Sequence, residues 1–221
     1  MEEPFWYALT EPQRADLLRI GTRRVFAAET VIVREQEASD FAVVVLDGCV
    51  KVCTYATHGY QVILGLRDAG DLLGELAGID GGLRSATLCA LTEVDALLLP
   101  GPAFRELLRA FPDAAALVQR TVSARLREAD RYRAAAGAQT SPQRLAALLL
   151  SLGRRYGVAA QDGALLIELP LSQQDLAGLI LASHRTLGRL LEQFRDQGMV
   201  ATGRRSLLLL DLPALRAVAA G

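Results

Sequence analysis

The chain of 221 residues has few cysteines: Cys49, Cys53 and Cys89 are its only thiols. This small, odd number of cysteines argues against a secreted scaffold held together by disulfides. It also falls short of the four thiolates that bind a conventional iron–sulfur cluster, so we expect neither a metal site nor a tightly bound cofactor. We expect each cysteine to be a small buried hydrophobic residue instead.

Long apolar runs are missing as well. Runs such as residues 41–46 have the length of a strand, well short of the roughly 18 residues of a membrane-spanning helix. The acidic start Met1-Glu2-Glu3 is unlike a signal peptide, and no acid–base pair or nucleophile constellation is evident. With 51% hydrophobic residues the composition excludes intrinsic disorder. We expect a soluble cytoplasmic protein that is not an enzyme and has no membrane partner.

The formal net charge of −1 hides an asymmetry between the two parts of the chain. Residues 1–115 carry 10 basic and 17 acidic side chains, a net charge of −7. Residues 116–221 carry 14 basic and 8 acidic side chains, a net charge of +6. A basic C-terminal part favours a module that binds a polyanion, although arginines that only solvate helix surfaces would give the same charge.

Short apolar runs dominate the first half of the chain after a predicted helix at residues 10–20. They occupy residues 30–34, 42–46, 50–54, 62–66 and 94–99. The dipeptide Asp47-Gly48 between two of them predicts a hairpin, because glycine readily adopts the positive φ of a tight primed turn. His58-Gly59 predicts another turn. Several short strands at regular spacing indicate an all-β roll or barrel.

After Pro100 the pattern becomes helical, with a short helix at 104–111 and a long one at 113–136 that lacks glycine and proline. We expect the apolar seam of the long helix to pair with a second copy of the chain, while packing on its own β-rich part is the alternative. Residues 137–142 predict a hinge, after which Ser141 caps the next helix with Pro142 at its first position. The seam comprises Val118, Val122, Arg125, Ala129, Tyr132 and Ala136.

The segment Gly74-Glu75-Leu76-Ala77, followed by Arg84-Ser85-Ala86, has the residue types of a phosphate cradle. Glycines let backbone N–H groups approach an anion, and arginine offers a planar fork for two phosphate oxygens. The segment resembles the phosphate-binding cassette of cyclic nucleotide-binding domains in the catabolite activator/FNR (CRP/FNR) family.

The resemblance implies that Arg84 and Ser85 hold the cyclic phosphate, with the backbone near Gly74 and Leu76 beside it, while Glu75 binds the ribose. It also implies that Arg125 pairs with Glu75. The family's two base-contacting positions fall on Ala129 and Asp130, of which only Asp130 offers acceptors, for an exocyclic amine. Cyclic AMP or a relative is therefore the expected effector, and its base is left open.

Two short capped helices follow at 172–180 and 183–195, the second basic at its start, and residues 203–206 form a basic turn between strands. This pattern resembles the family's winged helix-turn-helix. The resemblance implies that His184, Arg185 and Arg189 face base edges and that four polar residues contact phosphates. His184-Arg185 departs from the best-known family member, so that member's half-site is not carried over. The phosphate-contacting set is Ser172, Gln174, Ser183 and Thr186, and the turn contributes Arg204 and Arg205.

We therefore expect an α+β chain with a cyclic-nucleotide-binding-like β-roll sensor at 1–115, a dimerisation helix at 116–138 and a winged helix-turn-helix at 139–221. The predicted function is that of a homodimeric transcription regulator on a pseudo-palindromic DNA operator with half-sites about 10 base pairs apart. RNA polymerase is a further partner that the resemblance allows. The alternatives are a DNA-binding regulator with a degenerate sensor pocket, and a cyclic-nucleotide-binding regulatory subunit of another protein.

Overall fold

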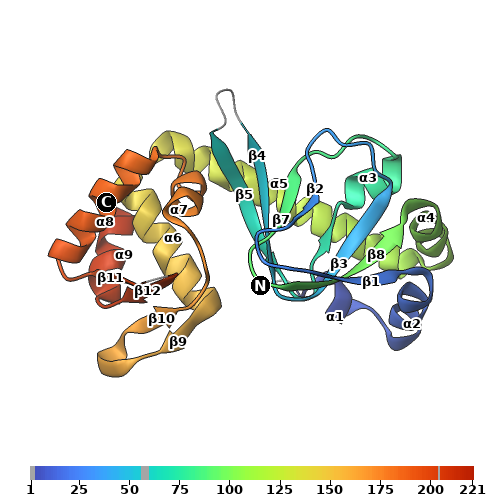
Figure 1. The fold of residues 1–221 in the computed structure, drawn as a ribbon, viewed down its shortest axis with the longest axis horizontal. Coiled ribbons are helices and arrows are strands. Elements are labelled where there is room, and N and C mark those ends of the chain that lie inside the picture. Colours follow the sequence, from blue (N-terminus) through green and yellow to red (C-terminus); the bar gives the residue numbers. More distant parts are fainter. Residues whose placement is uncertain (1–2, 56–59, 204) are drawn as a thin grey trace. The chain divides into compact units, whose positions relative to one another are not determined.

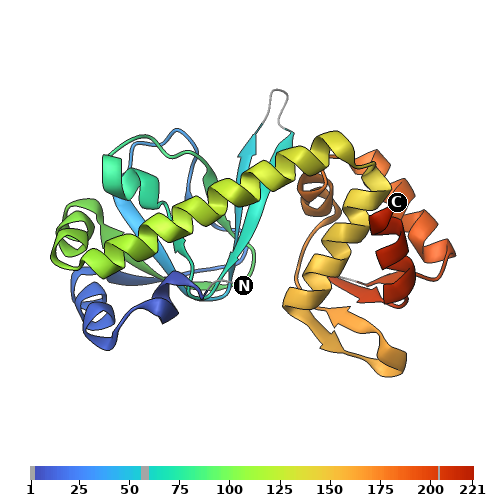
Figure 2. The same ribbon diagram turned by 180° about the vertical axis from the view of Figure 1, so that it is seen from behind.

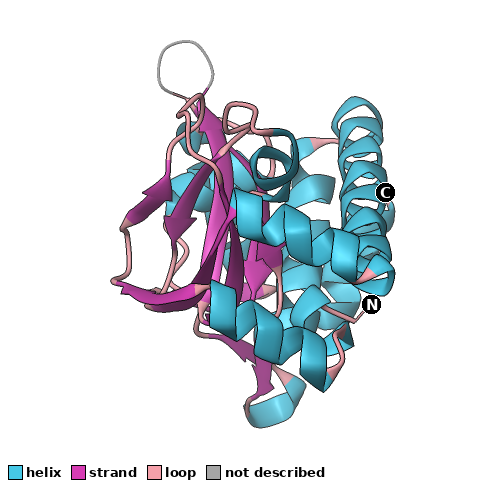
Figure 3. Ribbon diagram, turned by 90° about the vertical axis from the view of Figure 1, so that its right-hand side faces the viewer, coloured by secondary structure: helices cyan, strands magenta, loops and turns pink. Residues whose placement is uncertain are grey.

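The computed structural model describes residues 3–55, 60–203 and 205–221. The chain forms two compact units. The N-terminal unit comprises Met1–Thr54 and Leu64–Ala129, and the C-terminal unit comprises Tyr55–Ile63 and Asp130–Gly221. Figure 3 shows helices and strands throughout the chain, which confirms the predicted α+β class. The predicted limits at residues 115 and 138 remain predictions.

The β-roll of the N-terminal unit consists of two four-stranded sheets with the orders β1-β8-β3-β6 and β2-β7-β4-β5 (Figure 1). The five runs predicted as strands are confirmed. The sequence missed β1, β6 and β7. Strand β1 is polar and mostly exposed, β6 has only two residues, and β7 is buried at all four positions and so shows no alternation. The strands are β1 (Thr22–Phe26), β2 (Val31–Val33), β3 (Phe41–Asp47), β4 (Cys49–Tyr55), β5 (Gln61–Asp68), β6 (Leu72–Leu73), β7 (Thr87–Ala90) and β8 (Val94–Pro100).

Strand β3 has both faces buried and separates two apolar cores. Its residues Val43 and Val45 join the core between the two sheets. Its residues Ala42 and Val44 face the other way and pack with helical residues such as Phe104. The helices that cover this outer face are α1 (Phe5–Ala8), α2 (Glu11–Ile20), α4 (Gly101–Ala110) and the first part of α5 (Pro112–Ala138).

The turn at Asp47-Gly48 differs from the predicted hairpin. Gly48 has the expected positive φ of 90°, and a Cβ there would lie 2.1 Å from the Glu93 carbonyl oxygen. However, β3 pairs with β8 and β6, whereas β4 pairs with β7. The hairpin prediction was wrong because this turn passes the chain from one sheet to the other. The predicted turn at His58-Gly59 lies outside the described residues.

The long helix α5 extends further than the sequence predicted. It includes Gly137 and ends at Ala138, so the hinge prediction was wrong for these two residues. The next helix is capped by Thr140 rather than Ser141, because Gln143 completes a reciprocal capping box with Thr140. The predicted start of the first long helix, with Thr10 as its cap, is confirmed.

The apolar seam of α5 contacts the chain's own elements. Figure 2 shows the helix lying across the strands of the N-terminal unit. Val118 is buried in the helical core of that unit, and Val122 packs against the same core. In the C-terminal unit Tyr132 donates a hydrogen bond to the carbonyl of Leu179. Val118 and Val122 therefore pack within their own unit, as the alternative predicted, and the pairing of the rest of the seam with a second copy stays a prediction.

The C-terminal unit packs its helices on a small sheet of order β11-β12-β10-β9. Leu145, Leu149 and Phe194 are fully buried in this unit. The predicted helix pair and the strand pair after it are confirmed. The elements are α6 (Ser141–Tyr156), β9 (Gly157–Ala159), the 3₁₀ turn η2 (Gln161–Gly163), β10 (Leu165–Ile167), α7 (Gln173–Leu179), α8 (His184–Asp196), β11 (Val200–Gly203), β12 (Ser206–Leu209) and α9 (Leu212–Ala220).

Three side chains from different elements satisfy the carbonyl groups at the end of α7. Tyr132 donates to Leu179, Tyr60 donates to Ala182 at 3.0 Å, and Arg144 donates to Ile180 at 2.8 Å. The last carbonyls of a helix lack intrahelical donors, so such side chains replace them. The conformation of the turn between α7 and α8 is thus stabilised by side chains that lie far from it in the sequence.

We expect Tyr132→Phe to lower the free energy of unfolding by about 1–3 kcal/mol at pH 7, because a carbonyl loses its donor. Burial raises the pKa of Tyr132 to about 12. Its folded-state pKa therefore exceeds the ordinary value of 10, so its contribution is complete below pH 10 and disappears as the pH rises through 12. Urea unfolding as a function of pH measures both effects.

The exposed Tyr7 provides the matched control for this experiment. Tyr7→Phe should leave the unfolding curve at pH 7 unchanged. A Tyr132→Phe variant as stable as the wild type at pH 7, with the same loss of stability at high pH, would contradict the assigned role.

Candidate functional site

The predicted cassette is built around a short helix between two glycines with positive φ. Strand β6 ends at Leu73, Gly74 adopts φ 63°, and α3 (Glu75–Asp80) begins directly after it. Gly81 ends the helix with φ 70°, and the carboxylate of Asp80 accepts a 2.8 Å bond from the Gly82 N–H. Glycine meets this backbone requirement without strain, which other residues rarely do.

Glu75 and Arg125 form the predicted ion pair. The Nη1 atom of Arg125 lies 2.8 Å from the Oε1 atom of Glu75, whose side chain is buried. Arg125 also donates to the carbonyl of Leu72, just before the cassette. One arginine of α5 therefore contacts both the acid of α3 and the strand that leads into it.

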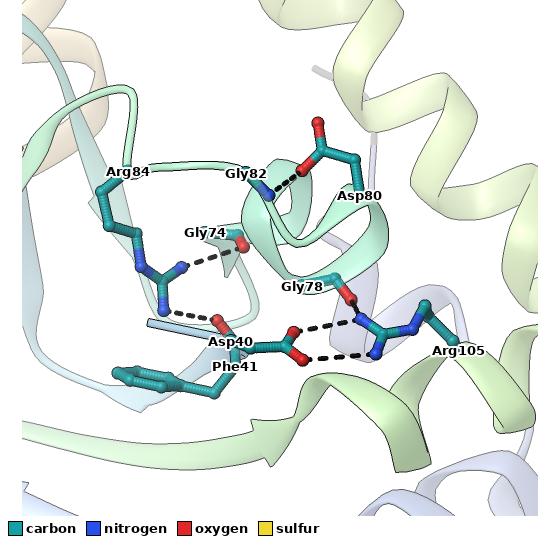
Figure 4. A network of polar contacts seen from close by, with 8 residues as sticks. All are labelled: Asp40, Phe41, Gly74, Gly78, Asp80, Gly82, Arg84 and Arg105. Carbon is teal, nitrogen blue, oxygen red and sulfur yellow. Dashed lines mark hydrogen bonds and ion pairs between the residues drawn. The ribbon is translucent and has the colours of Figure 1, made fainter. Parts of the chain in front are cut away.

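Arg84 is 2% exposed, and its guanidinium is bound by the protein itself. It donates to the carbonyl of Gly74 at 3.1 Å and to that of Phe41 at 2.7 Å (Figure 4). It also donates to Ser39 Oγ at 2.8 Å. The guanidinium carbon lies 4.4 Å from the centre of the Phe41 ring. Burial lowers the pKa of Arg84, while the charges of nearby carboxylates, including that of Glu37, oppose the shift.

Arg105 of α4 holds the same helix at its other end, a role that the sequence reading missed. It donates to the carbonyl of Gly78 at 2.9 Å and to the carboxylate of Asp40 at 3.0 Å (Figure 4). Asp40 lies between Ser39 and Phe41, which both accept from Arg84. No local motif marks Arg105, because its partners lie 27 and 65 residues away.

The remaining predicted ligand residues are more exposed. Leu76 lies on the open side of α3, and Ser85 is exposed beside Arg84. The carboxylate of Asp130 is 61% exposed and pairs with Arg133 of its own helix at 2.8 Å. The structure therefore brings Gly74, Glu75, Arg84 and Arg125 together, whereas Asp130 has a separate partner.

Most of the predicted DNA-facing residues lie at the starts of α7 and α8, and Arg189 lies further along α8. Ser172 caps α7 in a reciprocal box with Asp175, and the hydroxyl of Ser183 accepts from the Thr186 N–H at 3.1 Å. The exposed side of α8 carries His184, Arg185 and Arg189, and Gln174 is exposed on α7. The opposite side of α8 is the predicted apolar stripe, which is buried and comprises Leu187, Leu190, Leu191 and Phe194.

Arg205 is exposed in the turn between β11 and β12, where it adopts a φ of 60°. Arg204 lies outside the described residues. The two strands pair directly, with Gly203 opposite Ser206, so the basic turn is the tip of a hairpin.

Within residues 3–55, 60–203 and 205–221, no three His, Cys, Asp or Glu side chains lie together as metal ligands would. All three cysteines are buried, as predicted. The helices of the same described ranges include none that is long and apolar enough to cross a bilayer.

We expect Arg84→Met to lower the free energy of unfolding by about 2 kcal/mol or more without any ligand, because the partly buried carbonyls of Gly74 and Phe41 lose a charged donor. Chemical denaturation measures the change. Arg109→Met, at an exposed position of α4, is the matched control and should have little effect. Equal stability of the two variants would show that the contacts of Arg84 do not support the fold.

Two family models match the chain, a cyclic nucleotide-binding domain at residues 23–111 and a Crp-like helix-turn-helix domain at residues 143–218. A CRP-like cAMP-activated global transcriptional regulator of Mycobacterium tuberculosis is 29% identical over 81% of this chain and 80% of its own. The cyclic AMP receptor protein of Thermus thermophilus is 28% identical over 99% and 97% of the two chains.

Among solved structures, a CRP/FNR-family transcriptional regulator of Thermus thermophilus superimposes with a TM-score of 0.75. It is 26% identical, and the match covers 90% of this chain and 99% of the other. The two matched domains occur in this order on either side of the long helix α5, and the similar proteins named above are regulators of one family. The chain belongs to the CRP/FNR family of transcription regulators.

Proposed function

We propose that this chain acts as a homodimer that binds a DNA operator through α8 and is controlled by a cyclic nucleotide in the cassette around α3. One observation carries the proposal. The buried stripe of α8 fixes the helix in the unit, and this leaves His184, Arg185 and Arg189 exposed along its other side. Such a helix presents donors to the major groove, where guanine offers two acceptors.

The phosphate contacts of the proposed complex come from residues at the starts of the two helices. Helix N-termini favour anions because their first N–H groups lack intrahelical partners. Ser172 and Gln174 at the start of α7, with Ser183 and Thr186 at the start of α8, fit this role. Arg205 would add a contact from the turn between β11 and β12, and the role of Arg204 rests on the sequence alone.

Binding of a cyclic nucleotide requires Arg84 to change acceptors. Its guanidinium now donates to Gly74 and Phe41, so phosphate oxygens would have to replace these carbonyls. Charged phosphate oxygens are stronger acceptors than neutral carbonyls, which favours this exchange. Glu75 would take the ribose hydroxyl, and its partner Arg125 would connect the event to α5. Regulation of RNA polymerase would follow from occupancy of the operator.

Dimerisation would use a side of α5 that the chain itself leaves open. Leu126 of this helix is 59% exposed, whereas the seam residues Val118 and Val122 contact the chain's own core. A large exposed apolar side chain on a long helix is suited to a second copy of that helix. Two-fold symmetry then gives the operator its pseudo-palindrome.

The second candidate is an effector-independent DNA-binding regulator. The internal contacts of Arg84 favour this candidate. The guanidinium already has acceptors within the protein, so no bound phosphate is required to satisfy its donors. The two functions differ in one measurable property, the effect of a cyclic nucleotide on DNA affinity.

The experiment selects an operator from random-sequence DNA and measures its affinity by fluorescence anisotropy with and without cyclic AMP or cyclic GMP. We expect salt-dependent binding that one nucleotide strengthens, with a smaller effect of the nucleotide in Ser85→Ala. Equal affinity with and without either nucleotide would support the second candidate. Failure to select any DNA sequence would overturn both and favour a regulatory subunit.

We expect Arg189→Ala to reduce discrimination at one base pair of the selected operator by about 1–3 kcal/mol, because arginine reads a base edge. Competition with operators that carry single substitutions measures the change. Arg216→Ala, at an exposed position of α9, should leave discrimination intact. Equal weakening on all sequences by Arg189→Ala would reassign this residue to a phosphate.

A further inference from the structure

The turn between α7 and α8 contains a residue whose backbone conformation is unfavourable for its side chain. Leu181 adopts a φ of 51°, in the left-handed region. A residue with a Cβ is strained there because the Cβ comes close to a carbonyl oxygen, whereas glycine is not. The turn of a helix-turn-helix often contains glycine. This chain instead has leucine at the left-handed position of the turn.

The hydrogen bonds at the end of α7 explain why the turn takes this conformation. The N–H of Ala182 donates to the carbonyl of Ala177 at 3.0 Å. A bond back over five residues is typical of a Schellman cap, in which the residue before the donor is left-handed. Here that residue is Leu181. Ser183 caps α8 two residues later, so the backbone at Leu181 directs the chain from α7 into α8.

Three side chains of the C-terminal unit surround the strained turn with donors. Tyr60, Tyr132 and Arg144 donate to the carbonyls of residues 177–180 and 182. Burial raises the pKa of both tyrosines, so their phenols stay protonated as donors at neutral pH. A strained residue persists where the surrounding structure fixes its conformation. These three donors provide that constraint for the turn.

Two of the three donors belong to segments that continue into the N-terminal unit. A Cβ at Gly178 would lie 2.8 Å from the carbonyl oxygen of Gln61, so the start of β5 lies directly against α7. Tyr60 immediately precedes this strand, and Tyr132 lies on α5. Residues 64–68 of β5 and 112–129 of α5 belong to the unit that contains the cassette. The turn is therefore constrained by segments that are covalently continuous with that unit.

We propose that Tyr60, Tyr132 and Arg144 are positioning residues for DNA binding, which hold the strained turn at Leu181 in the conformation that presents α8 to the major groove. This inference rests on the proposed function, since it requires DNA binding through α8. When a donor is lost, the strain at Leu181 favours relaxation of the turn, and α8 loses its orientation. Leu181→Gly removes the strain, so the turn then keeps its conformation with fewer donors.

A double-mutant cycle on the full-length protein tests the proposal, with operator affinity measured by fluorescence anisotropy under the conditions in which the wild type binds best. We expect Tyr132→Phe alone to weaken operator binding by about tenfold or more, and by less than about threefold when it is combined with Leu181→Gly. Tyr60→Phe, which removes a different donor, should depend on Leu181→Gly in the same way. Circular dichroism verifies that each variant is folded at the assay temperature.

Two controls separate strain at the turn from other effects. Leu181→Ala shortens the side chain but keeps the Cβ and its strain, so it should not rescue Tyr132→Phe. Tyr7→Phe, at an exposed tyrosine, should leave the Kd of the operator unchanged with or without Leu181→Gly.

The outcomes distinguish this inference from the proposed function. An equal loss of affinity in Tyr132→Phe with and without Leu181→Gly would overturn the inference and leave the proposed function standing. Rescue by Leu181→Ala as complete as that by Leu181→Gly would also overturn it, because the size of the side chain and not the backbone strain would then matter. Absence of DNA binding by the wild type would refute the proposed function, and this inference with it.

Discussion

The conformation of the cassette depends on the buried guanidinium of Arg84. Its donors reach Gly74 at the start of α3 and Ser39 and Phe41 before β3, so one charged group joins segments that are far apart in the sequence. Buried carbonyls require partners, and a charged donor provides strong ones. Arg105 stabilises the same helix by a hydrogen bond to the carbonyl of Gly78. A phosphate that binds here must compete with bonds that already support the fold, which couples ligand binding to the position of α3.

A change in the position of α3 would be transmitted to the rest of the chain through helix α5. Within the N-terminal unit Arg125 pairs with Glu75 and Glu128 pairs with Arg67. Within the C-terminal unit Tyr132 of the same helix bonds to the carbonyl of Leu179 at the end of α7. A single continuous helix thus carries side chains that contact the cassette and side chains that contact the helix-turn-helix. If the proposed function holds, α5 is the element shared by the two sites that allosteric control requires.

Local sequence patterns predicted correctly those features that depend on residues close together in the chain. Ser172 and Ser183 cap their helices as predicted, because a capping residue and its target N–H lie within one turn. The turn at Gly48 shows the limit of this reasoning. The positive φ of Gly48 was predicted correctly. Whether the flanking strands pair with each other depends on the other strands of the sheets, and here β3 pairs with β8 and β4 with β7.

The order of a strand-rich part, a long helix and two short capped helices could be predicted from the sequence, because periodicity, capping residues and glycine positions are local features. The resemblance to the family added the identity of the cassette and of the winged helix-turn-helix. That Arg84 donates to the protein's own carbonyls, and that Arg67 pairs with Glu128 61 residues later, is visible only in the folded structure. The partner of a long charged side chain depends on which distant groups packing brings within about 3 Å of it, and no local pattern encodes that distance.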